Sequence, residues 1–430
     1  MDHDEKVRLL VNYFKESEVE REERKLGLEL EHMVVEKGSL EATSYYEEGG
    51  IEDLLFALSE RDWDPVREGE HLLGLESDKA SLTLEPGGQV EISIAPQEGL
   101  EELENVYAGF LEEAVEILER TGKKLLAIGY QPESSVEEIK LLPKKRYDYM
   151  YDYFADRGQY AHNMMKGTGS VHVNLDYTDE ADYIQKNAVA TYLTPMVYAA
   201  VDNSPFFEGQ VHERGSTRAR IWDNCDPERC GYLEGTFSDR FGYHDYAEYL
   251  LNVPVMIYRK GGELFYDKER RVEDVIAPDL TEKELKYLLS TVFPDVRTRS
   301  YLEVRMGDAL PLPYSMAYAA LWKGLLYDRE NLGFLYRTCS EVDPGEYRNT
   351  REKVQRGERS GDGDLQELFS FYKELIRAAE EGLRPDEEKY LAPLKELAER
   401  YSTPKKRTLE GLEDGKEEAL AWCDMKNCIE

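Results

Sequence analysis

The stretch LTLEPGGQVEISIAP, residues 82–96, constrains this chain more than any other because it specifies both a turn and the strands beside it. Proline fixes one backbone angle and glycine tolerates a positive φ, so the Pro-Gly-Gly at 86–88 favours a tight turn. From Val90 onward apolar and polar residues alternate, which is typical of a strand whose two faces differ in polarity. The stretch therefore predicts a β-hairpin that carries Glu85 and Glu91 on its polar side.

Three other segments, at 25–35, 168–177 and 301–307, alternate in the same manner. Their polar faces and that of the hairpin carry groups that can bind ions or substrates: Glu29, Glu31, Glu85, Gln89, Glu91, His172, Asn174, Glu303 and Arg305. If the four segments belong to one antiparallel sheet, helices cover its apolar face and the polar face lines a cavity. Taken singly, each glutamate is typical of a solvated strand and the histidine of a hydrogen-bonded core residue. The joint pattern instead indicates a site.

Carboxylates brought together in such a cavity would repel one another at neutral pH, and either raised pKa values or bound divalent cations would relieve this repulsion. Oxygen ligands with one imidazole suit Mg²⁺, or Mn²⁺, better than zinc. ATP-dependent enzymes use such metals to hold polyphosphate. The chain has no Walker A motif, no GxGxxG after a predicted strand and no GxSxG, so P-loop, Rossmann, kinase and hydrolase sites are unsupported.

Between the predicted strands, apolar residues recur at helical spacing. Helices are expected at 4–24, 49–61, 98–121, 179–201, 280–293, 313–327, 364–384 and 386–401, with a buried strand at 124–130 and a helix followed by a strand over 243–260. An irregular loop rich in Arg and Asp is expected at 214–231, a mobile polar loop at 352–363 and a frayed tail from 402. These elements predict an α+β fold with a catalytic domain at 1–345 and a C-terminal helical extension at 346–430, packed on that domain or trailing it.

Composition narrows the possible functions. The chain has 430 residues and a net charge of −35, which opposes binding to nucleic acid and to anionic membranes. Any anionic substrate therefore requires a local metal or arginine cluster. No run approaches the roughly 18 apolar residues of a membrane helix, and the absence of a secretory signal makes a cytoplasmic location the expectation. The five cysteines lack CxxC spacing and are expected to be free thiols.

Eight segments carry a family resemblance, in this order: KLGLELEH, LEPGGQVEIS, GYQP, LLPKKRYDYM, TGSVHVNLDY, RIWDNCDPERCG, FPDVRTRSYLEVRMGDALP and GLLYD. They resemble plant-type glutamate–cysteine ligases, a group within the glutamine synthetase-like superfamily, and EPGGQxE and YLExR are the most specific motifs. The resemblance implies a curved, mainly antiparallel sheet that forms a half-funnel with helices on its outer face. It also implies a step of glutathione biosynthesis: ATP phosphorylates the γ-carboxylate of L-glutamate, and L-cysteine then attacks γ-glutamyl phosphate to give γ-glutamylcysteine, ADP and phosphate.

The resemblance also assigns roles to residues. The Mg²⁺ ligands would be Glu29, Glu31, Glu85, Glu91, His172 and Glu303. Catalysis would depend on Glu303 and on Arg305, which would stabilise the transferring phosphoryl group. The substrate-binding residues would be Arg146, Arg218, Trp222, Gln89 and Asn174, and the two arginines among them would clamp substrate carboxylates. The implied small-molecule partners are ATP, L-glutamate and L-cysteine, with monomer and homodimer both left open.

Two departures from the family pattern leave the amine acceptor open. Residues 222–226 read WDNCD where family members have WTDTD, and TGSVH precedes Asn174 where plant sequences have TCTVQ. The alternatives are a glutamate–amine ligase with another acceptor and an ATP phosphotransferase that does not ligate. A non-catalytic homologue is a third alternative, which the retained Glu, His and Arg set opposes.

Overall fold

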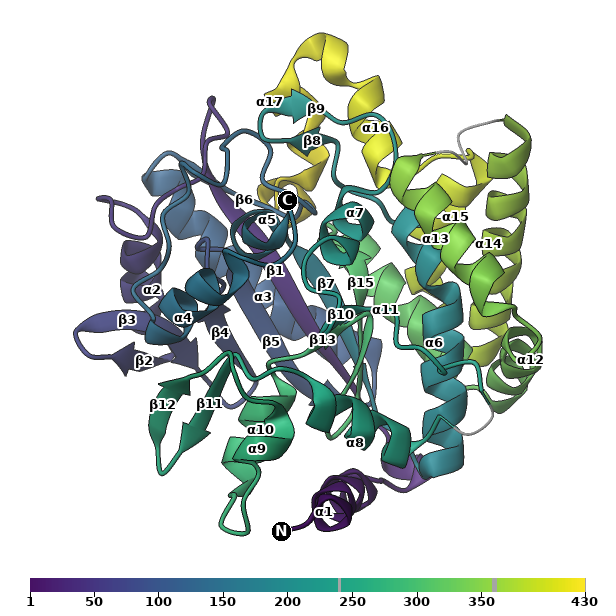
Figure 1. The fold of residues 1–430 in the computed structure, drawn as a ribbon. Coiled ribbons are helices and arrows are strands. Elements are labelled where there is room, and N and C mark those ends of the chain that lie inside the picture. The colour runs from purple at the N-terminus through teal and green to yellow at the C-terminus, as the bar shows by residue number, and fades with distance from the viewer. Residues whose placement is uncertain (239–240, 358–361, 430) are drawn as a thin grey trace.

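The computed structural model describes residues 1–238, 241–357 and 362–429. Its centre is an open antiparallel sheet of nine strands in the order β14-β15-β7-β1-β5-β4-β3-β2, with β6 paired to the carboxyl end of β1 (Figure 1). These strands are β1 (Leu26–Glu36), β2 (Asp64–Glu68), β3 (His71–Glu76), β4 (Ala80–Leu84), β5 (Val90–Gln97), β6 (Lys123–Leu126), β7 (Ser170–Leu175), β14 (Val296–Thr298) and β15 (Leu302–Asp308). The α+β class and the mainly antiparallel sheet expected from the sequence are confirmed.

Three short strand pairs lie outside this sheet. They are β8 (Phe206–Phe207) with β9 (Gln210–Val211), β10 (Cys230–Gly231) with β13 (Phe293–Pro294), and β11 (Ile257–Lys260) with β12 (Glu263–Tyr266). The pair β10–β13 is parallel and leads directly into β14. It therefore connects the loop after α7 to the edge of the main sheet.

The longer helices surround the sheet, and α3, α6 and α11 among them pack against its apolar face. The longer helices are α1 (His3–Glu16), α2 (Ile51–Ser59), α3 (Leu100–Arg120), α4 (Lys145–Phe154), α6 (Glu180–Ala200), α8 (Tyr243–Asn252), α10 (Glu282–Leu289), α11 (Leu312–Leu326), α12 (Arg329–Cys339), α13 (Pro344–Arg356), α14 (Asp362–Gly382) and α15 (Ala392–Glu399). Helix α3 packs on β5 and β6, α6 on β15, and α11 on β7. Helices α14 and α15 then pack on α11 as a second layer, and α13 and α14 both pack against α6, at the right of Figure 1.

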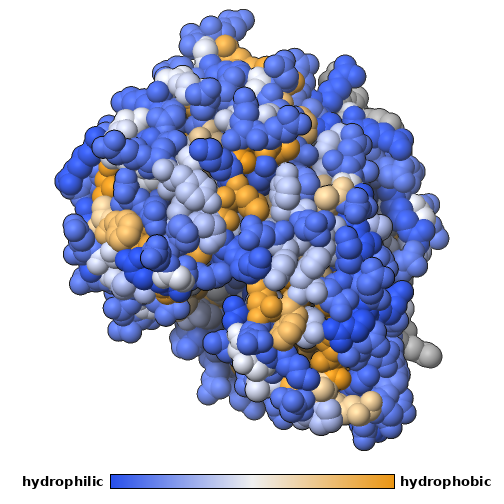
Figure 2. All heavy atoms as spheres, turned by 60° about the vertical axis from the view of Figure 1, so that its left-hand side comes forward, coloured by the Kyte–Doolittle hydropathy of each residue, from blue (hydrophilic) through white to orange (hydrophobic). Residues whose placement is uncertain are grey.

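Shorter helices complete the chain. They are α5 (Ala161–Gly167), α7 (Thr217–Asp223), α9 (Val272–Val275), α16 (Pro404–Glu410), α17 (Lys416–Ala419) and α18 (Lys426–Ile429), with 3₁₀ turns at Arg21–Glu23, Glu388–Leu391, Leu412–Asp414 and Ala421–Cys423. Among the described residues, no helix combines the length and the apolar content needed to span a bilayer. The face drawn in Figure 2 is largely hydrophilic, with apolar side chains gathered in a few patches.

Strand alternation separates the core from the polar face. Leu28 and Leu30 of β1 are buried, at 0% and 2% exposure, on the face that the helices cover. Burying a leucine side chain contributes about 2 kcal/mol, so a shift of the register by one residue would be strongly unfavourable. The same register fixes Glu29 and Glu31 on the opposite face.

The predicted hairpin is confirmed, and its two glycines are required for different reasons. Gly88 has φ +91, and its N–H donates to the Glu85 carbonyl at 2.8 Å. Gly87 lies against the backbone of α5, where an added Cβ would lie 2.3 Å from the Lys166 carbonyl oxygen. The turn is therefore both a left-handed conformation and a close backbone contact.

Most expected helices are present with shorter bounds, and the N-terminal helix shows why. It ends at Glu16 rather than near 24 because the Val19 N–H donates to the Tyr177 carbonyl, at 3.1 Å. This tertiary hydrogen bond ties the segment to the end of β7 and replaces further helical turns. The strands β2 and β3 were not expected from the sequence.

Residues 214–231 are not irregular throughout, so this expectation is wrong in part. Residues Thr217–Asp223 form α7, and the Ser216 hydroxyl caps it by accepting from the Ala219 N–H at 3.2 Å. A serine cap satisfies one of the unpaired N–H groups of a helix start. The Arg- and Asp-rich composition obscured this signal.

The C-terminal region is more ordered than expected. Residues 352–356 complete α13, whose end is Gly357 at φ 67, while residues 358–361 lie outside the described residues. The tail from 402 is not frayed, because its backbone pairs with β6 and with the residue that follows it. The Ala127 N–H donates to the Cys423 carbonyl at 3.0 Å, and the Met425 N–H donates to the Leu125 carbonyl at 2.9 Å.

Candidate active site

The antiparallel register places the predicted site residues side by side on one face of the sheet. On β1, Glu29 pairs with His172 of β7 and with Ser93 of β5. Glu31 pairs directly with Glu91 of β5. Because residues i and i+2 of a strand share a face, these side chains all project to the same side.

These polar side chains continue across β7 to β15 and β14 at the edge of the sheet. Asn174 of β7 pairs with Glu303 of β15, and Glu303 pairs with Arg297 of β14. Arg305 follows Glu303 by two positions and is therefore on the same face. The four alternating segments thus belong to one sheet, as the sequence predicted.

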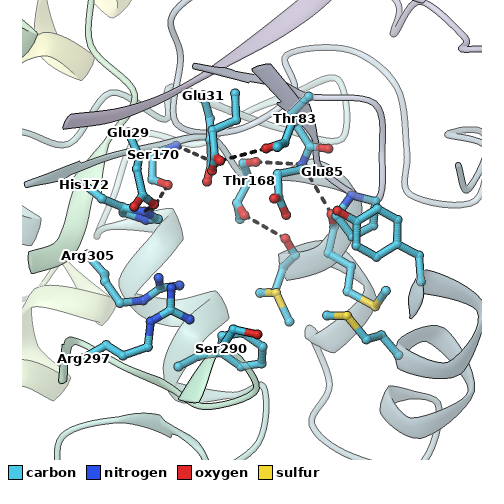
Figure 3. A pocket seen from close by; sticks show the side chains of 18 of the residues that line it. Glu29, Glu31, Thr83, Glu85, Thr168, Ser170, His172, Ser290, Arg297 and Arg305 are labelled. Carbon is cyan, nitrogen blue, oxygen red and sulfur yellow. Dashed lines mark hydrogen bonds and ion pairs between the residues drawn. The ribbon is translucent and has the colours of Figure 1, made fainter. Parts of the chain in front are cut away.

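This polar face lines a cavity of about 300 Å³, whose other walls come from α4, α5, α7 and the segment around β13 (Figure 3). The predicted residues that line it are Glu29, Glu31, Glu85, Gln89, Glu91, Arg146, His172, Arg218, Trp222 and Arg305. Glu303 lies behind this lining at 0% exposure. Asn174 lines a second cavity of about 380 Å³, which shares Glu29 and Ser93 with the first.

The acidic wall consists of carboxylates held by hydrogen bonds. Glu29 accepts from Asn174 Nδ2 at 2.9 Å and pairs with His172 Nδ1 at 3.1 Å. Glu31 accepts from a backbone N–H of β7 at 2.9 Å. Glu91 accepts from two side-chain hydroxyls, at 2.9 and 3.1 Å. Each carboxylate is thus fixed in orientation while it still lines the cavity.

Electrostatic repulsion within the acidic wall is not relieved by these hydrogen bonds. Burial and the neighbouring Glu85 raise the pKa of Glu31 to about 7. Burial and the charges of Glu29 and Glu85 raise the pKa of Glu91 well above its ordinary range. Like charges directly opposite each other on adjacent strands are destabilising. The Glu31–Glu91 pair therefore requires a proton or a cation.

On the opposite side, Glu303 anchors two arginines. Arg297 donates from Nε and Nη2 to its two oxygens at 2.5 and 2.7 Å, and Arg305 donates from Nη1 at 2.7 Å. Burial raises the pKa of Glu303, but Arg297 and Arg305 outweigh it and hold this pKa well below its ordinary range. The Arg305 guanidinium also lies 5.7 Å from the Trp222 ring and 5.9 Å from the Phe293 ring. Two aromatic rings thus flank its charge.

The two arginines predicted to clamp substrates have different surroundings. Arg146 lines the cavity and donates to the Ser290 hydroxyl at 3.2 Å and carbonyl at 3.1 Å. Arg218 is 1% exposed, lies 3.3 Å from Asp308 and donates to the Arg305 carbonyl at 3.2 Å. Arg218 thus lines the cavity while its guanidinium is bonded to β15, whereas Arg146 is placed to meet a ligand directly.

Gln89 serves the hairpin turn. Its side-chain Oε1 accepts from the Gly87 N–H at 3.0 Å, and its side-chain Nε2 donates to the Thr168 carbonyl at 2.8 Å. These bonds hold the turn against the end of α5. A role of Gln89 in substrate binding stays a prediction.

Sequence reasoning did not single out three cations that line the cavity: Lys144, Arg297 and Arg299. Arg297 and Arg299 have the i, i+2 spacing that identified the glutamates, so a signal was present in the RTR segment before β15. The hydroxyl donors to Glu91 were also missed. Serine and threonine are common in strands, and nothing in the sequence marks those that donate to a buried carboxylate.

The donor set of this site fits hard divalent cations. Glu29, His172 and Glu303 each offer one ligand atom, and these three atoms lie within 4.8 Å of one another. Among the described residues, Asn174 Oδ1 is a buried oxygen with no hydrogen-bond partner, and the facing carboxylates of β1 and β5 need positive charge. Carboxylate oxygens with one imidazole are ligands that Mg²⁺ and Mn²⁺ accept.

Among solved structures, the glutamate–cysteine ligase of Francisella tularensis, in complex with AMP, resembles this chain. The TM-score is 0.54 at 12% identity, and the match covers 93% of this chain and 87% of that one. At this identity the likeness concerns the fold alone. It supports the fold that the sequence resemblance implied.

Relatives with similar sequences include the chloroplastic glutamate–cysteine ligases of Nicotiana tabacum and Medicago truncatula. They are 33% and 34% identical to this chain over 416 residues, which is 93% of this chain and 78% and 81% of theirs. Their names contradict the cytoplasmic location expected above, so that expectation is wrong. It rested only on the absence of a secretory signal, and no physical property of the fold determines a compartment.

The family model described as glutamate–cysteine ligase family 2 matches residues 25–420. This span contains both specific motifs, the acidic wall, the arginines opposite it and most of the C-terminal helices. The chain therefore belongs to glutamate–cysteine ligase family 2, and the resemblance inferred from its motifs is confirmed.

Proposed function

We propose that this protein is an ATP-dependent ligase that couples the γ-carboxylate of L-glutamate, through γ-glutamyl phosphate, to the amine of L-cysteine. The products are γ-glutamylcysteine, ADP and phosphate. The observation that carries the proposal is a single cavity in which the acidic wall faces a second wall, the arginine wall, formed by Arg297 and Arg305. Phosphoryl transfer needs both, because cations must hold the polyphosphate and fixed positive charge must stabilise the transferred group. Membership of the family supports this reaction.

Two groups of side chains would hold Mg²⁺, or Mn²⁺ in its place. The first is the set whose ligand atoms already lie together: Glu29, His172 and Glu303. The second comprises the carboxylates that repel one another: Glu31, Glu85 and Glu91. Bound cations would neutralise the charge of the ATP phosphates and polarise the transferring group. The carboxylate of Glu303 accepts three hydrogen bonds from Arg297 and Arg305. A carboxylate has about four lone-pair positions, so about one remains to bind a cation.

Arg305 and Arg297 would stabilise the negative charge that develops on the transferred phosphoryl group. Both guanidinium groups line the cavity and are fixed by Glu303. Donors that are already oriented need no reorganisation when the charge appears. Trp222 and Phe293 flank Arg305 and would keep water from that side of its charge.

Arg146 would bind a substrate carboxylate. It lines the cavity, and its two bonds to Ser290 fix the plane of its guanidinium. A fixed plane favours the bidentate geometry that carboxylates prefer. Lys144, which also lines the cavity, adds a second positive charge on the same side.

The second cavity would hold the nucleoside of ATP. It adjoins the site through Glu29 and Ser93, so a nucleotide placed there can direct its phosphates toward the first group of cation ligands. Its lining includes Tyr301 and Asp78. An aromatic face and a hydrogen-bond acceptor are suited to a base and a ribose.

The side chain of the amine acceptor would lie near α4 and α5. Three methionines from these helices line the cavity: Met150, Met164 and Met165. Polarizable thioethers favour a small apolar or sulfur-containing side chain, in line with L-cysteine. The same surface would also accept 2-aminobutyrate, so the acceptor has to be measured.

The direct test supplies purified protein with MgATP, L-glutamate and L-cysteine, and measures phosphate and γ-glutamylcysteine together. We expect equal amounts of both, dependent on the amine. Phosphate release that is independent of any amine would indicate a phosphotransferase. Product from another amine but not from cysteine would indicate a different acceptor, and the absence of all turnover would contradict the proposal.

A further inference from the structure

Helix α13, from the C-terminal part of the chain, sends one buried side chain to the back of the arginine wall. Arg351 is 5% exposed, and its guanidinium contacts two carboxylates from different elements. Its Nε lies 2.9 and 2.8 Å from the two oxygens of Asp223, and its Nη1 lies 2.5 Å from Asp295. Asp223 ends α7, and Asp295 joins β13 to β14. One guanidinium therefore ties together two elements that are distant in sequence.

Those two elements carry the groups that surround Arg305. Asp223 directly follows Trp222, and Asp295 lies two residues after Phe293. The rings of Trp222 and Phe293 are 6.0 Å apart, and both flank the Arg305 guanidinium. The Asp295 carbonyl also accepts the backbone N–H of Arg305 at 3.0 Å.

We propose that Arg351 is a positioning residue for phosphoryl transfer. By holding Asp223 and Asp295 together, it sets the separation of α7 from the β13–β14 segment, and so the place of Arg305 in the cavity. This inference rests on the ligase function proposed above. It gives the C-terminal helices a part in the chemistry, although they lie outside the sheet that carries the acidic wall.

Helix α13 is itself anchored firmly enough to act as a fixed support. The Tyr347 hydroxyl donates to the Thr191 carbonyl of α6 at 2.8 Å. The Val354 carbonyl accepts the N–H of Ser216, the cap of α7, at 3.1 Å. Arg351 therefore extends from a helix that is bonded to both the core and the start of α7.

The chemistry of the contact suits positioning better than mere charge balance. A guanidinium presents donors in a planar fork, so it fixes the orientation of both carboxylates as well as their distance. The Tyr198 hydroxyl adds a further bond to Asp295 at 3.1 Å. Arg351 itself lies outside the cavity lining. Its loss should therefore change the rate of the chemical step and leave substrate affinity nearly unchanged.

The first test compares Arg351→Gln and Arg351→Lys with the wild-type enzyme. A displacement of about 1 Å in a catalytic group costs about 100-fold in rate, so we expect kcat of Arg351→Gln to fall about 100-fold. The KM values for MgATP and L-glutamate should stay close to those of the wild type. Arg351→Lys should recover part of kcat, because it keeps the charge but loses the fork. The matched control is Arg348→Gln, which changes an exposed arginine of the same helix, paired with Glu234 at 3.2 Å.

A second variant separates positioning from folding. Arg351→Gln leaves the buried carboxylate of Asp295 and the half-buried carboxylate of Asp223 without their cation, which can destabilise the fold. The triple variant Asp223→Asn, Asp295→Asn, Arg351→Gln removes all three charges together and keeps the shapes of the two aspartate side chains. We expect this triple variant to unfold within a few degrees of the wild type and still to show a strongly reduced kcat.

Wild-type kcat in the folded triple variant, or in Arg351→Gln, would overturn the role of Arg351. Equal falls in kcat for Arg348→Gln and Arg351→Gln would overturn it as well. The proposed ligase function fails by a different result, the absence of γ-glutamylcysteine with wild-type protein. Phosphate release is measured in the same reactions, so the effect of Arg351 on phosphoryl transfer can be read even if no dipeptide forms.

Discussion

The two walls of the cavity are built in different ways. The acidic wall comes from β1, β5 and β7, which are neighbours in one sheet, and strand register alone aligns its side chains. The arginine wall combines the β14–β15 hairpin with α7 and is supported from behind by α13. The first wall depends on alternation and pairing, whereas the second depends on ion pairs between distant elements.

The walls also differ in electrostatic balance. In the arginine wall each buried charge has an opposite partner, as in the contacts of Glu303 with Arg297 and Arg305. In the acidic wall Glu31 and Glu91 face each other, and their pKa values are raised. A buried charge without a partner is strongly unfavourable. The comparison therefore supports the proposal that the arginine wall binds anions without further change and that the acidic wall depends on a bound cation.

The largest effect should follow loss of the arginine wall. Arg305→Ala removes a positioned positive charge from phosphoryl transfer, and such arginines contribute about 10³-fold or more to kcat. We expect a loss of about 1,000-fold in phosphate release, near 4 kcal/mol in the barrier, with the melting temperature little changed. Arg400→Ala is the control, because Arg400 is 72% exposed and pairs only at the surface with Glu396. Turnover near that of the wild type would refute the assignment of Arg305.

A smaller and reversible effect should follow damage to the acidic wall. Glu29→Gln keeps the side-chain shape but removes the charge that would bind a cation. Residues that merely support a metal ligand contribute about 10- to 100-fold to metal affinity, so we expect activation by Mg²⁺ to weaken about 100-fold. Excess Mg²⁺ should restore part of the rate here but not in Arg305→Ala. The control is Glu263→Gln, an exposed strand residue of β12.

If added Mg²⁺ restores Glu29→Gln and Arg305→Ala equally, the acidic wall is no more dependent on a cation than the arginine wall. A rate for Glu29→Gln that no Mg²⁺ concentration changes would likewise place this residue outside the cation site. Titration of initial rate against free Mg²⁺ at fixed ATP distinguishes these results.

A third prediction concerns how stability and Mg²⁺ affinity change with pH. The direction of both changes follows from the raised pKa of Glu31. Its pKa is raised from 4.5 to about 7, so without a cation its ionisation destabilises the fold. That destabilisation is absent below pH 4.5 and grows as pH rises toward about 7. Because a cation must displace this proton, Mg²⁺ affinity should rise about tenfold per pH unit below 7 and level off above it.

The measurement is the Mg²⁺-induced rise in melting temperature between pH 5.5 and 8, which should grow with pH. Glu31→Gln should flatten this dependence, since it has no proton to lose. A rise that is equally steep in the wild type and in Glu31→Gln would show that other groups control it.

The acidic wall could be predicted from the sequence, whereas the support of the arginine wall could not. Alternation in four short segments was enough to place Glu29, Glu31, Glu91 and His172 on one face, because side-chain period and strand pairing are local rules. Arg351 could not be found this way. Its partners Asp223 and Asp295 are more than fifty residues away in sequence. A helix rich in charged residues is also expected to be exposed to solvent unless its packing is known.

The segments expected to be irregular show a second reason why the sequence could not predict the whole fold. The tail after 402 has the polar composition of a frayed end, yet the Met425 N–H pairs with the Leu125 carbonyl at 2.9 Å. Such backbone bonds do not depend on side-chain identity, so composition carries no trace of them. The cap Ser216 was visible in the sequence, but nearby arginines and aspartates suggested a loop.

The smallest effect concerns the hairpin turn, and it tests whether the acidic wall depends on local geometry. Gly88 and Gly122 both have positive φ, +91 and +73. Alanine at a positive φ costs about 1 kcal/mol of stability, so Gly88→Ala and Gly122→Ala should both lower the free energy of unfolding, Gly88→Ala by at least as much as Gly122→Ala. They differ in position: Gly88 lies three residues after Glu85, and its added Cβ would lie 2.6 Å from Ile51 Cδ1. Apart from its own chain neighbours, no described residue has an atom within 4 Å of a Cβ at Gly122. Only Gly88→Ala should therefore shift the Mg²⁺ concentration for half-maximal rate. An equal shift in both variants would mean that global stability, rather than the turn, controls cation binding.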